Sequence, residues 1–410
     1  MSRSIAIALS RWSGYSWLVA ALAMLVVLTS NAMTNAGLTV FDESLLNELG
    51  CSVAQLKVRD SITFLATSLL VLLAGWLVDR YGFKPFLLIG LTLLGVSYLL
   101  YSQAQSLAQL YLLHLLFAVV LALAGITVSV ITAATWMPRR RGLAIGLTVA
   151  GTSIGGILIP PLANALNTRF GWRSAMRMEA VWPLLLVVVL MVALRNRPKR
   201  DGSETDAAAA ATKAGEGMTF SDVLRRRQFF QVAFAGSLTF FAVLSLFSHL
   251  FLFMRSHGFD PATASLGLSL FSLAGLAGKL GSGWISDRVD AYRLLRVQMF
   301  TMLAGLVGIT LVPSFIWIFL IVTGLGWGSL HTLFNYILIT LFGLRDAGKI
   351  NGTVSIVNAA GGGLGILLTG LAHDALGGYP EAFGIVCAVM FLGALLTLRL
   401  RPPRETAAAT

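Results

Sequence analysis

Polar side chains inside the long apolar stretches of this 410-residue chain are the ones that could do chemistry. Lys279 stands out, because it lies deep in an apolar stretch and eight residues before Asp287, hence about 12 Å away along a helix. A lysine at the centre of a membrane costs roughly 2.5–3.5 kcal/mol or more, so a compensating interaction is expected. An anionic substrate in a water-filled cavity would supply it. The alternative is a structural lysine that reaches a headgroup or a counter-ion.

Neutral polar residues in other apolar stretches are candidates to line the same cavity. Asn31 and Asn35 are one helical turn apart and therefore share a face. For each such residue the plainer alternative is a hydrogen bond between helices. The expected substrate-binding residues are Lys279, Asn31, Asn35, His331, Asn335, Tyr336, Asn358 and His249.

Several kinds of chemistry are not expected. The sequence shows no nucleophile–base constellation and no paired histidine spacing typical of a metal site, so we expect no enzyme, no catalytic or metal-binding residue and no cofactor. We also expect Lys279 to be the single deep charge, with no Asp or Glu deep in a spanning stretch. Among the deep side chains, a proton could then be taken up and released by histidine, whose unperturbed pKa is about 6.5.

The elements that must position these residues are membrane helices. Hydrophobic residues make up 57% of the chain and charged residues 12%, against an ordinary charged share of about 25%. Continuous apolarity over about 20 residues, without alternation, predicts spanning helices rather than a barrel. The expected spans are about 15–38, 61–79, 84–103, 107–136, 142–167, 174–195, 228–254, 262–285, 294–313, 315–342, 350–372 and 380–399.

The net charge is +12, and the basic residues are divided unequally between the two expected sides of the membrane. Most of the 30 Lys and Arg residues fall in segments that would be cytoplasmic if the N-terminus is inside. The positive-inside rule therefore predicts that both termini are cytoplasmic. This placement excludes a nucleic-acid partner and favours contact with anionic lipid. The basic residues expected on the outer side are Lys57, Arg59, Arg169, Arg173, Arg177 and Arg255.

A short string occurs twice and predicts two similar halves. Gly75-Trp76-Leu77-Val78-Asp79-Arg80 returns 208 residues later as Gly283-Trp284-Ile285-Ser286-Asp287-Arg288. Duplicated halves are a common plan of secondary transporters. We expect a six-helix bundle over 1–195, a partly disordered cytoplasmic linker over 196–227, a second six-helix bundle over 228–402 and a cytoplasmic tail over 403–410.

The loop after the second span, Gly75 to Lys84, resembles the signature of the major facilitator superfamily: Gly, a small gap, Asp-Arg, Gly and a basic residue. The resemblance implies the major facilitator fold, with twelve transmembrane helices in two six-helix pseudo-repeats. It also implies that Asp79 and Asp287 latch the inner side closed. The residues expected to take part in gating are Asp79, Arg80, Asp287, Arg288 and Arg140.

The segment 136–173 is similar to the monocarboxylate-transporter and oxalate/formate-exchanger branch of that family. It runs from Trp136-Met137-Pro138 through a glycine-rich stretch to Gly171-Trp172-Arg173. In that branch the position of Lys279 typically carries an arginine that binds the substrate carboxylate, whereas lysine offers a point charge instead of a fork.

This branch implies a proton-coupled symporter or anion exchanger for a small mono- or dicarboxylate that works by alternating access. We expect a multi-pass monomer in the cell inner (plasma) membrane. The alternative is a proton-coupled exporter of drugs or metabolites, because exporters of the same family also carry glycine-rich stretches of this kind.

Overall fold

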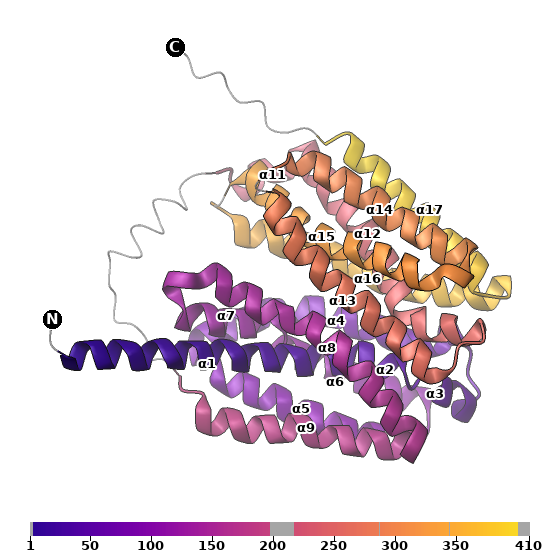
Figure 1. The fold of residues 1–410 in the computed structure, drawn as a ribbon, viewed down its shortest axis with the longest axis horizontal. Helices are drawn as coiled ribbons and strands as arrows, with labels where there is room; N and C mark the ends of the chain where they lie inside the picture. Colours follow the sequence, from indigo (N-terminus) through magenta and orange to yellow (C-terminus); the bar gives the residue numbers. More distant parts are fainter. Residues whose placement is uncertain (1–2, 197–216, 287, 344, 401–410) are drawn as a thin grey trace, which may run out of the picture. The chain divides into compact units, whose positions relative to one another are not determined.

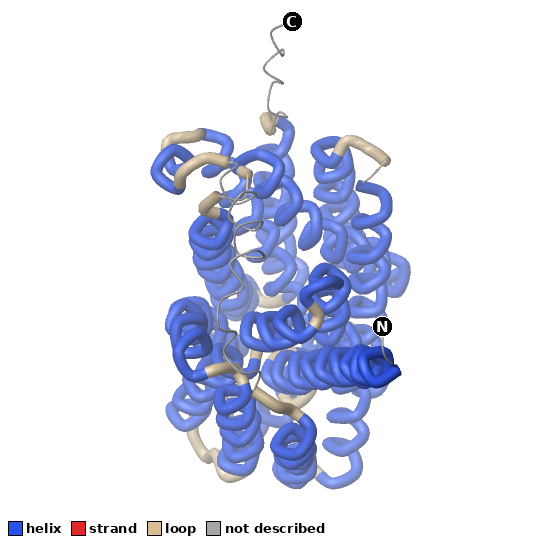
Figure 2. Tube along the Cα trace, turned by 90° about the vertical axis from the view of Figure 1, so that its left-hand side faces the viewer, coloured by secondary structure: helices blue, strands red, loops and turns tan. Residues whose placement is uncertain are grey.

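The computed structural model describes residues 3–196, 217–286, 288–343 and 345–400, and these are almost entirely helical (Figure 1). Figure 2 shows helices joined by loops, with no strand in the described part of the chain. The helices are α1 (Arg3–Thr34), α2 (Ala36–Thr39), α3 (Asp42–Leu49), α4 (Val53–Tyr81), α5 (Lys84–Tyr101), α6 (Leu107–Ala124), α7 (Ile126–Trp136), η1 (Pro138–Arg140), α8 (Arg141–Phe170), α9 (Trp172–Ala193), α11 (Phe220–Leu224), α12 (Arg227–Ser256), α13 (Pro261–Ser286), α14 (Ala291–Leu311), η2 (Pro313–Phe315), α15 (Ile316–Phe342), α16 (Ala347–Leu376) and α17 (Tyr379–Leu398).

Length and apolarity let most of these helices cross a bilayer. Eleven segments of the described chain meet both conditions, from Gly14–Thr39 to Tyr379–Leu398. The expected second span, 61–79, lies within the 29-residue α4, which begins earlier than expected and includes Lys57, Arg59 and Asp60. The expected all-helical membrane fold is thereby confirmed.

The expected fourth span, 107–136, is broken into two helices, α6 and α7, at Gly125. A Cβ added to Gly125 would lie 2.1 Å from the carbonyl oxygen of Leu121, so the backbone at this break requires glycine. The Ser30 hydroxyl donates to the Ala124 carbonyl at 2.8 Å. A carbonyl at the end of a helix has no partner within that helix, so this bond compensates for the break.

The chain groups into two compact units. Unit 1 holds residues 1–199 and 247–273, and unit 2 holds residues 200–246 and 274–410. Helices α12 and α13 therefore contribute residues to both units. The boundaries expected at 195 and 228 stay a prediction. Residues 197–216 of the expected linker and all of the expected tail, 403–410, lie outside the described residues, while the described rest of the linker includes α11.

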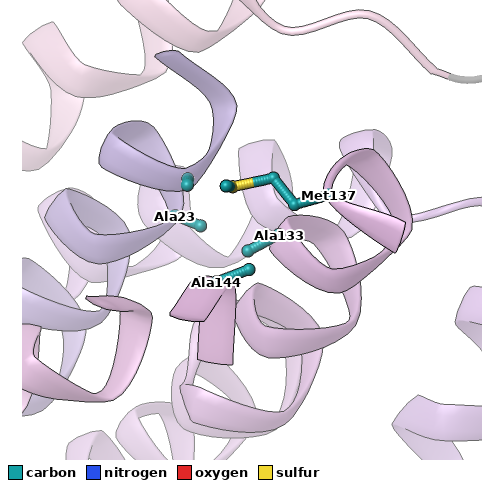
Figure 3. Packing of buried hydrophobic residues seen from close by; sticks show 5 residues of the cluster. Ala23, Ala133, Met137 and Ala144 are labelled. Carbon is teal, nitrogen blue, oxygen red and sulfur yellow. The ribbon is translucent and has the colours of Figure 1, made fainter. Parts of the chain in front are cut away.

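Small residues bring the helices of unit 1 close together. One buried cluster joins α1, α7 and α8, and Figure 3 shows four of its members, Ala23, Ala133, Met137 and Ala144. Further along α8, a Cβ added to Gly151 would lie 2.4 Å from the carbonyl oxygen of Met24 in α1. Close approach of this kind replaces the hydrophobic effect as the force that joins helices in a membrane.

Unit 2 packs by the same means. A Cβ added to Gly305 of α14 would lie 2.2 Å from the Thr323 hydroxyl oxygen of α15, and one added to Gly326 of α15 would lie 2.8 Å from the Met302 side chain. The two helices are thus in backbone-level contact, and α17 packs on α14 beside them (Figure 1). This rigid pair supports the helix face that carries the candidate site.

Candidate functional site

Lys279 is positioned by a close crossing of α13 and α15. A Cβ added to Gly328 of α15 would lie 1.9 Å from the carbonyl oxygen of Gly275 and 2.9 Å from the backbone nitrogen of Lys279. One added to Gly278 would lie 2.3 Å from the carbonyl oxygen of Leu325. The glycines therefore fix the height and rotation of Lys279 relative to α15.

His331 lies close to Lys279 on the facing helix. Both side chains are half-buried, and the Lys279 ammonium acts electrostatically on the His331 imidazole. The Ser329 hydroxyl donates to the carbonyl of Gly278 at 3.2 Å and so ties the two helices at the same level. A cation and an imidazole are thus held on facing helices, within electrostatic reach of each other.

Aromatic rings border this pair. The ring of Trp327 meets the His331 imidazole edge-on with centroids 5.8 Å apart, and it meets Phe240 of α12 edge-on at 5.1 Å. Such edge-to-face pairs contribute about 0.5–1.5 kcal/mol beyond the area that they bury. Sequence reasoning assigned no role to the tryptophans, and a tryptophan one helical turn before a mid-span histidine was the signal that it missed.

Asn335 and Tyr336 follow His331 by one turn, as expected, but they are more exposed than the residues above. The Asn335 amide donates to the carbonyl of His331 at 2.8 Å, a bond within its own helix. The Tyr336 side chain is 42% exposed. Asn335, four residues on, therefore continues the helix face that carries His331, whereas Tyr336, five residues on, lies about 140° around the helix from it.

Asn358 lies in α16 against α12. A Cβ added to Gly236 would lie 2.8 Å from the Asn358 side-chain oxygen, and the Ser237 hydroxyl donates to the carbonyl of Val357 at 2.9 Å. The Asn358 Oδ1 atom is buried and has no hydrogen-bond partner in the described part of the chain. Buried amide groups are rarely left unsatisfied, so this one is available to a ligand or to water.

The remaining expected binding residues belong to unit 1. The Asn35 amide donates to the Asn31 carbonyl at 2.9 Å, at the break between α1 and α2. The Asn31 Nδ2 atom is buried with no hydrogen-bond partner among the residues described. His249 of α12 is completely buried. The structure therefore brings Asn31 and Asn35 together in one unit and Lys279, His331, Asn335 and Tyr336 together in the other.

The two copies of the repeated string make the same local contact. The guanidinium of Arg80 lies 5.6 Å from the Trp76 ring centroid, and that of Arg288 lies 3.7 Å from the Trp284 ring centroid. Both arginines are exposed, as is Arg140. Asp287 lies outside the described residues, and the side chain of Asp79 is also not described. The matching cation–π pairs are consistent with duplicated halves.

A deep acid was not expected, and that expectation is wrong. Glu179 lies in the third turn of α9, is 6% exposed, and neither of its carboxyl oxygens has a hydrogen-bond partner among the described residues. Its charge acts electrostatically on Tyr98 of α5. Glu179 stands within the expected span 174–195, so the signal was visible in the sequence. Lys279 is therefore not the single deep charge.

A buried charge cluster in unit 1 was missed as well. It consists of Asp42 of α3 and Lys57, Arg59 and Asp60 of α4, whose side chains are 0%, 0%, 0% and 12% exposed. The Lys57 ammonium donates to Asp42 at 2.5 Å and to Asp60 at 3.2 Å, and Arg59 pairs with Asp42. Lys57 and Arg59 were expected in an outer loop, whereas helix α4 begins before them. The sequence feature that could have indicated this cluster is three charged residues within four positions directly before an apolar run.

Comparison with known proteins places the chain in a family. Residues 20–366 match the family model described as Major Facilitator Superfamily. The chain is 28% identical over 332 residues to monocarboxylate transporter 13 of Bos taurus, covering 78% of this chain and 75% of that protein. It is 21% identical over 407 residues to the hexuronate transporter of Bacillus subtilis strain 168, covering 91% and 92%.

A solved structure shares the fold. The crystal structure of a bacterial homologue of the human lysosomal transporter Spinster, in an inward-facing and occupied conformation, superposes with a TM-score of 0.74. It is 16% identical and covers 93% of this chain and 96% of that one. At this identity the likeness concerns the fold alone.

Proposed function

Because this chain belongs to the major facilitator superfamily, whose members are membrane transporters rather than enzymes, we propose that it is a secondary active transporter of a small mono- or dicarboxylate. The anion binds at Lys279, and alternating access exposes it to each side in turn as residues 1–195 rock against 228–402. Asn31, Asn35, Asn358 and His249 are the further residues that we assign to the transport path.

One observation carries the proposal: the Lys279 ammonium acts electrostatically on the His331 imidazole across the α13–α15 crossing, and His331 packs against the ring of Trp327. A cation together with a ring that can form a hydrogen bond is suited to binding a carboxylate. The aromatic border matches the carbon body of the same molecule. Small-molecule sites combine these features, with a few polar groups that fix orientation in a mainly apolar wall.

The relatives support the same class of substrate. One is named for monocarboxylates and another for hexuronates, and both of these are carboxylates. The two names differ in the size and polarity of the molecule that carries the charge. The carboxylate is therefore the common chemistry on which the proposal rests.

We further propose that the chain is a monomer in the plasma membrane with both termini in the cytoplasm, in contact with anionic lipid. The distribution of Lys and Arg supports this orientation. In this arrangement Asp79 and Asp287 latch the inner side, together with Arg80, Arg288 and Arg140.

Transport of the carboxylate would be coupled either to symport of a proton or to exchange for another anion. A proton-coupled exporter of drugs or metabolites is a second candidate, because Glu179 provides a buried membrane acid of the kind that cation exporters use. The two candidates differ in the charge of the substrate, so a ligand panel separates them.

The experiment is a thermal-stability panel on detergent-purified protein. The ligands are lactate, oxalate, a hexuronate, a neutral sugar and a cationic dye, tested on the wild type, Lys279→Gln and Lys279→Arg. A ligand at 100 times its dissociation constant stabilises by about 2.7 kcal/mol. We expect stabilisation by a carboxylate that Lys279→Gln abolishes and Lys279→Arg retains, because arginine keeps the charge.

The matched control is Lys349→Gln. Lys349 is 69% exposed and pairs with Asp346 at 3.2 Å, so this variant removes one positive charge away from the site. It should keep the carboxylate response. Stabilisation by the cationic dye alone would refute the anion proposal and favour the exporter. Carboxylate stabilisation that survives in Lys279→Gln would refute the role of Lys279.

A further inference from the structure

Ser248 of α12 is joined to the buried charge cluster through both of its polar groups. The Lys57 ammonium donates to the Ser248 carbonyl oxygen at 2.5 Å. The Ser248 hydroxyl donates to Asp60 at 2.8 Å. A single residue of the segment 247–273 thus completes the hydrogen bonding of two charged side chains of α4, all within unit 1.

The cluster is balanced without Ser248. Two carboxylates, Asp42 and Asp60, face two cations, Lys57 and Arg59, and Arg59 also donates to the Tyr101 hydroxyl at 2.6 Å. Breaking a buried ion pair is costly because it leaves a charge without compensation. Removing Ser248 breaks two hydrogen bonds but no ion pair, so the four charges stay compensated.

A second contact joins the same segment to the N-terminal helices. Arg255 of α12 forms a two-bond pair with Glu43 of α3, at 2.7 and 2.9 Å. The side chains are 27% and 38% exposed, so water already reaches this pair. A half-exposed pair is worth about 1 kcal/mol or less and separates at little cost.

A third contact lies between α8 and α13. The Ser269 hydroxyl donates to the carbonyl of Ile157 at 2.7 Å, and a Cβ added to Gly156 would lie 2.4 Å from the Ser272 hydroxyl oxygen. Residues 247–273 are therefore held against the N-terminal helices by hydrogen bonds and by one exposed ion pair. Apolar side chains of the same segment, among them Leu250, Phe251 and Phe253, are buried as well.

We propose that Asp42, Lys57, Asp60 and Ser248, together with the Glu43–Arg255 pair, form an outer gate that must separate before the transport path opens to the outside. The inference rests on the proposed transport cycle and topology, in which residues 247–273 are the outer ends of α12 and α13. The other parts of α12 and α13 belong to unit 2. Opening moves Ser248 and Arg255 away, while Asp42, Lys57, Arg59 and Asp60 remain together.

The gate makes Ser248 itself the reporter. In a Cys51→Ser, Cys387→Ser background, Ser248→Cys carries the single thiol, and a membrane-impermeant methanethiosulfonate is added to the outside of intact cells. Ser248 is 6% exposed, so the closed gate protects the thiol. Labelling needs no transported substrate, so its outcome is independent of whether the anion proposal holds.

Glu43→Gln and Arg255→Gln are the gate variants. Each should speed labelling of Ser248→Cys by up to about fivefold, because about 1.4 kcal/mol corresponds to a tenfold change in an equilibrium and a half-exposed pair contributes less than that. The double variant should be no faster than either single one, because both remove the same pair.

The matched control lies on the same helix. Glu48 of α3 pairs with Arg173 of α9, which belongs to the N-terminal helices, and its side chain is 42% exposed. Glu48→Gln removes the same chemistry at similar exposure but no contact with 247–273, so labelling should match the parent. Equal labelling rates in Glu43→Gln and Glu48→Gln, whether both slow or both fast, would overturn the gate.

Discussion

The crossing that positions Lys279 predicts a sharp effect of one methyl group. In Gly328→Ala the new Cβ would lie 1.9 Å from the carbonyl oxygen of Gly275 and 2.8 Å from the carbonyl carbon of the same residue. Carbon–oxygen contacts at helix interfaces are normally about 3.3–3.6 Å, so the helices must separate. Both obstacles are backbone atoms, and no side-chain rotation relieves the clash.

Two effects of this substitution oppose each other. Alanine improves the helix propensity of α15 by about 0.8–1.0 kcal/mol relative to glycine. Overpacking costs about 1–3 kcal/mol and more where the backbone must move. We expect the clash to win, with a net loss of about 2 kcal/mol. Because the same methyl would lie 2.9 Å from the Lys279 backbone nitrogen, the site is displaced as well.

The assay is thermal unfolding in detergent, followed by the carboxylate response. Gly328→Ala should lower the apparent midpoint by several degrees and weaken or abolish stabilisation by the carboxylate. The control is Gly281→Ala, where an added Cβ meets no described atom within 4 Å. That variant should be as stable as the wild type or slightly more so. If both variants behave alike, α13 and α15 do not cross as closely as described, and the account of how Lys279 is positioned fails.

Two further outcomes follow from carboxyl groups of unit 1. The hydrogen bonds from Arg173 and Trp172 hold the pKa of Glu48 below its usual value of 4.5. Its stabilising contribution is therefore complete above that value and is lost as the pH falls through the lowered pKa. The wild type should exceed Glu48→Gln in stability at pH 7, and the difference should disappear as the pH falls from 4.5 through the lowered pKa; a pH-independent difference would contradict this. Glu179→Leu replaces an unsatisfied buried carboxyl by an apolar group of similar size. It should raise the free energy of unfolding by about 1–3 kcal/mol, measured in thermal or denaturant melts. A lower free energy of unfolding would mean that Glu179 has a partner.

The architecture followed from the sequence because it depends on composition and repetition. Apolar runs of bilayer length and a string repeated after 208 residues are enough to predict spanning helices in two halves. The placement of Lys279 within one long apolar helix could also be predicted, since it is counted along that helix, while its role stays a prediction. The surroundings of Lys279 across the crossing could not be counted in this way, because its electrostatic effect on His331 depends on the glycines of two helices that are far apart in sequence.

The missed residues have a different cause. Charged residues are typical of loops, so Lys57 and Arg59 were expected in an outer segment although a capping serine, Ser52, starts the helix before them. A buried ion cluster needs partners from several elements, and only the fold brings Asp42 and Ser248 to α4. Glu179 was overlooked for the opposite reason, since a lone carboxyl in a long apolar run barely changes its hydropathy.

The paired arginines and tryptophans at the repeated string have a consequence for how the protein responds to bilayer thickness. Arg80 lies over Trp76, and Arg288 lies over Trp284. In each pair a guanidinium, which binds phosphate, contacts an indole, which prefers the depth of the lipid headgroups. Each half of the molecule therefore carries its own depth marker at the same point of its repeat. In a bilayer of different thickness each marker would stay at the depth of its headgroups, and the mismatch would fall on the other end of the helix that carries it.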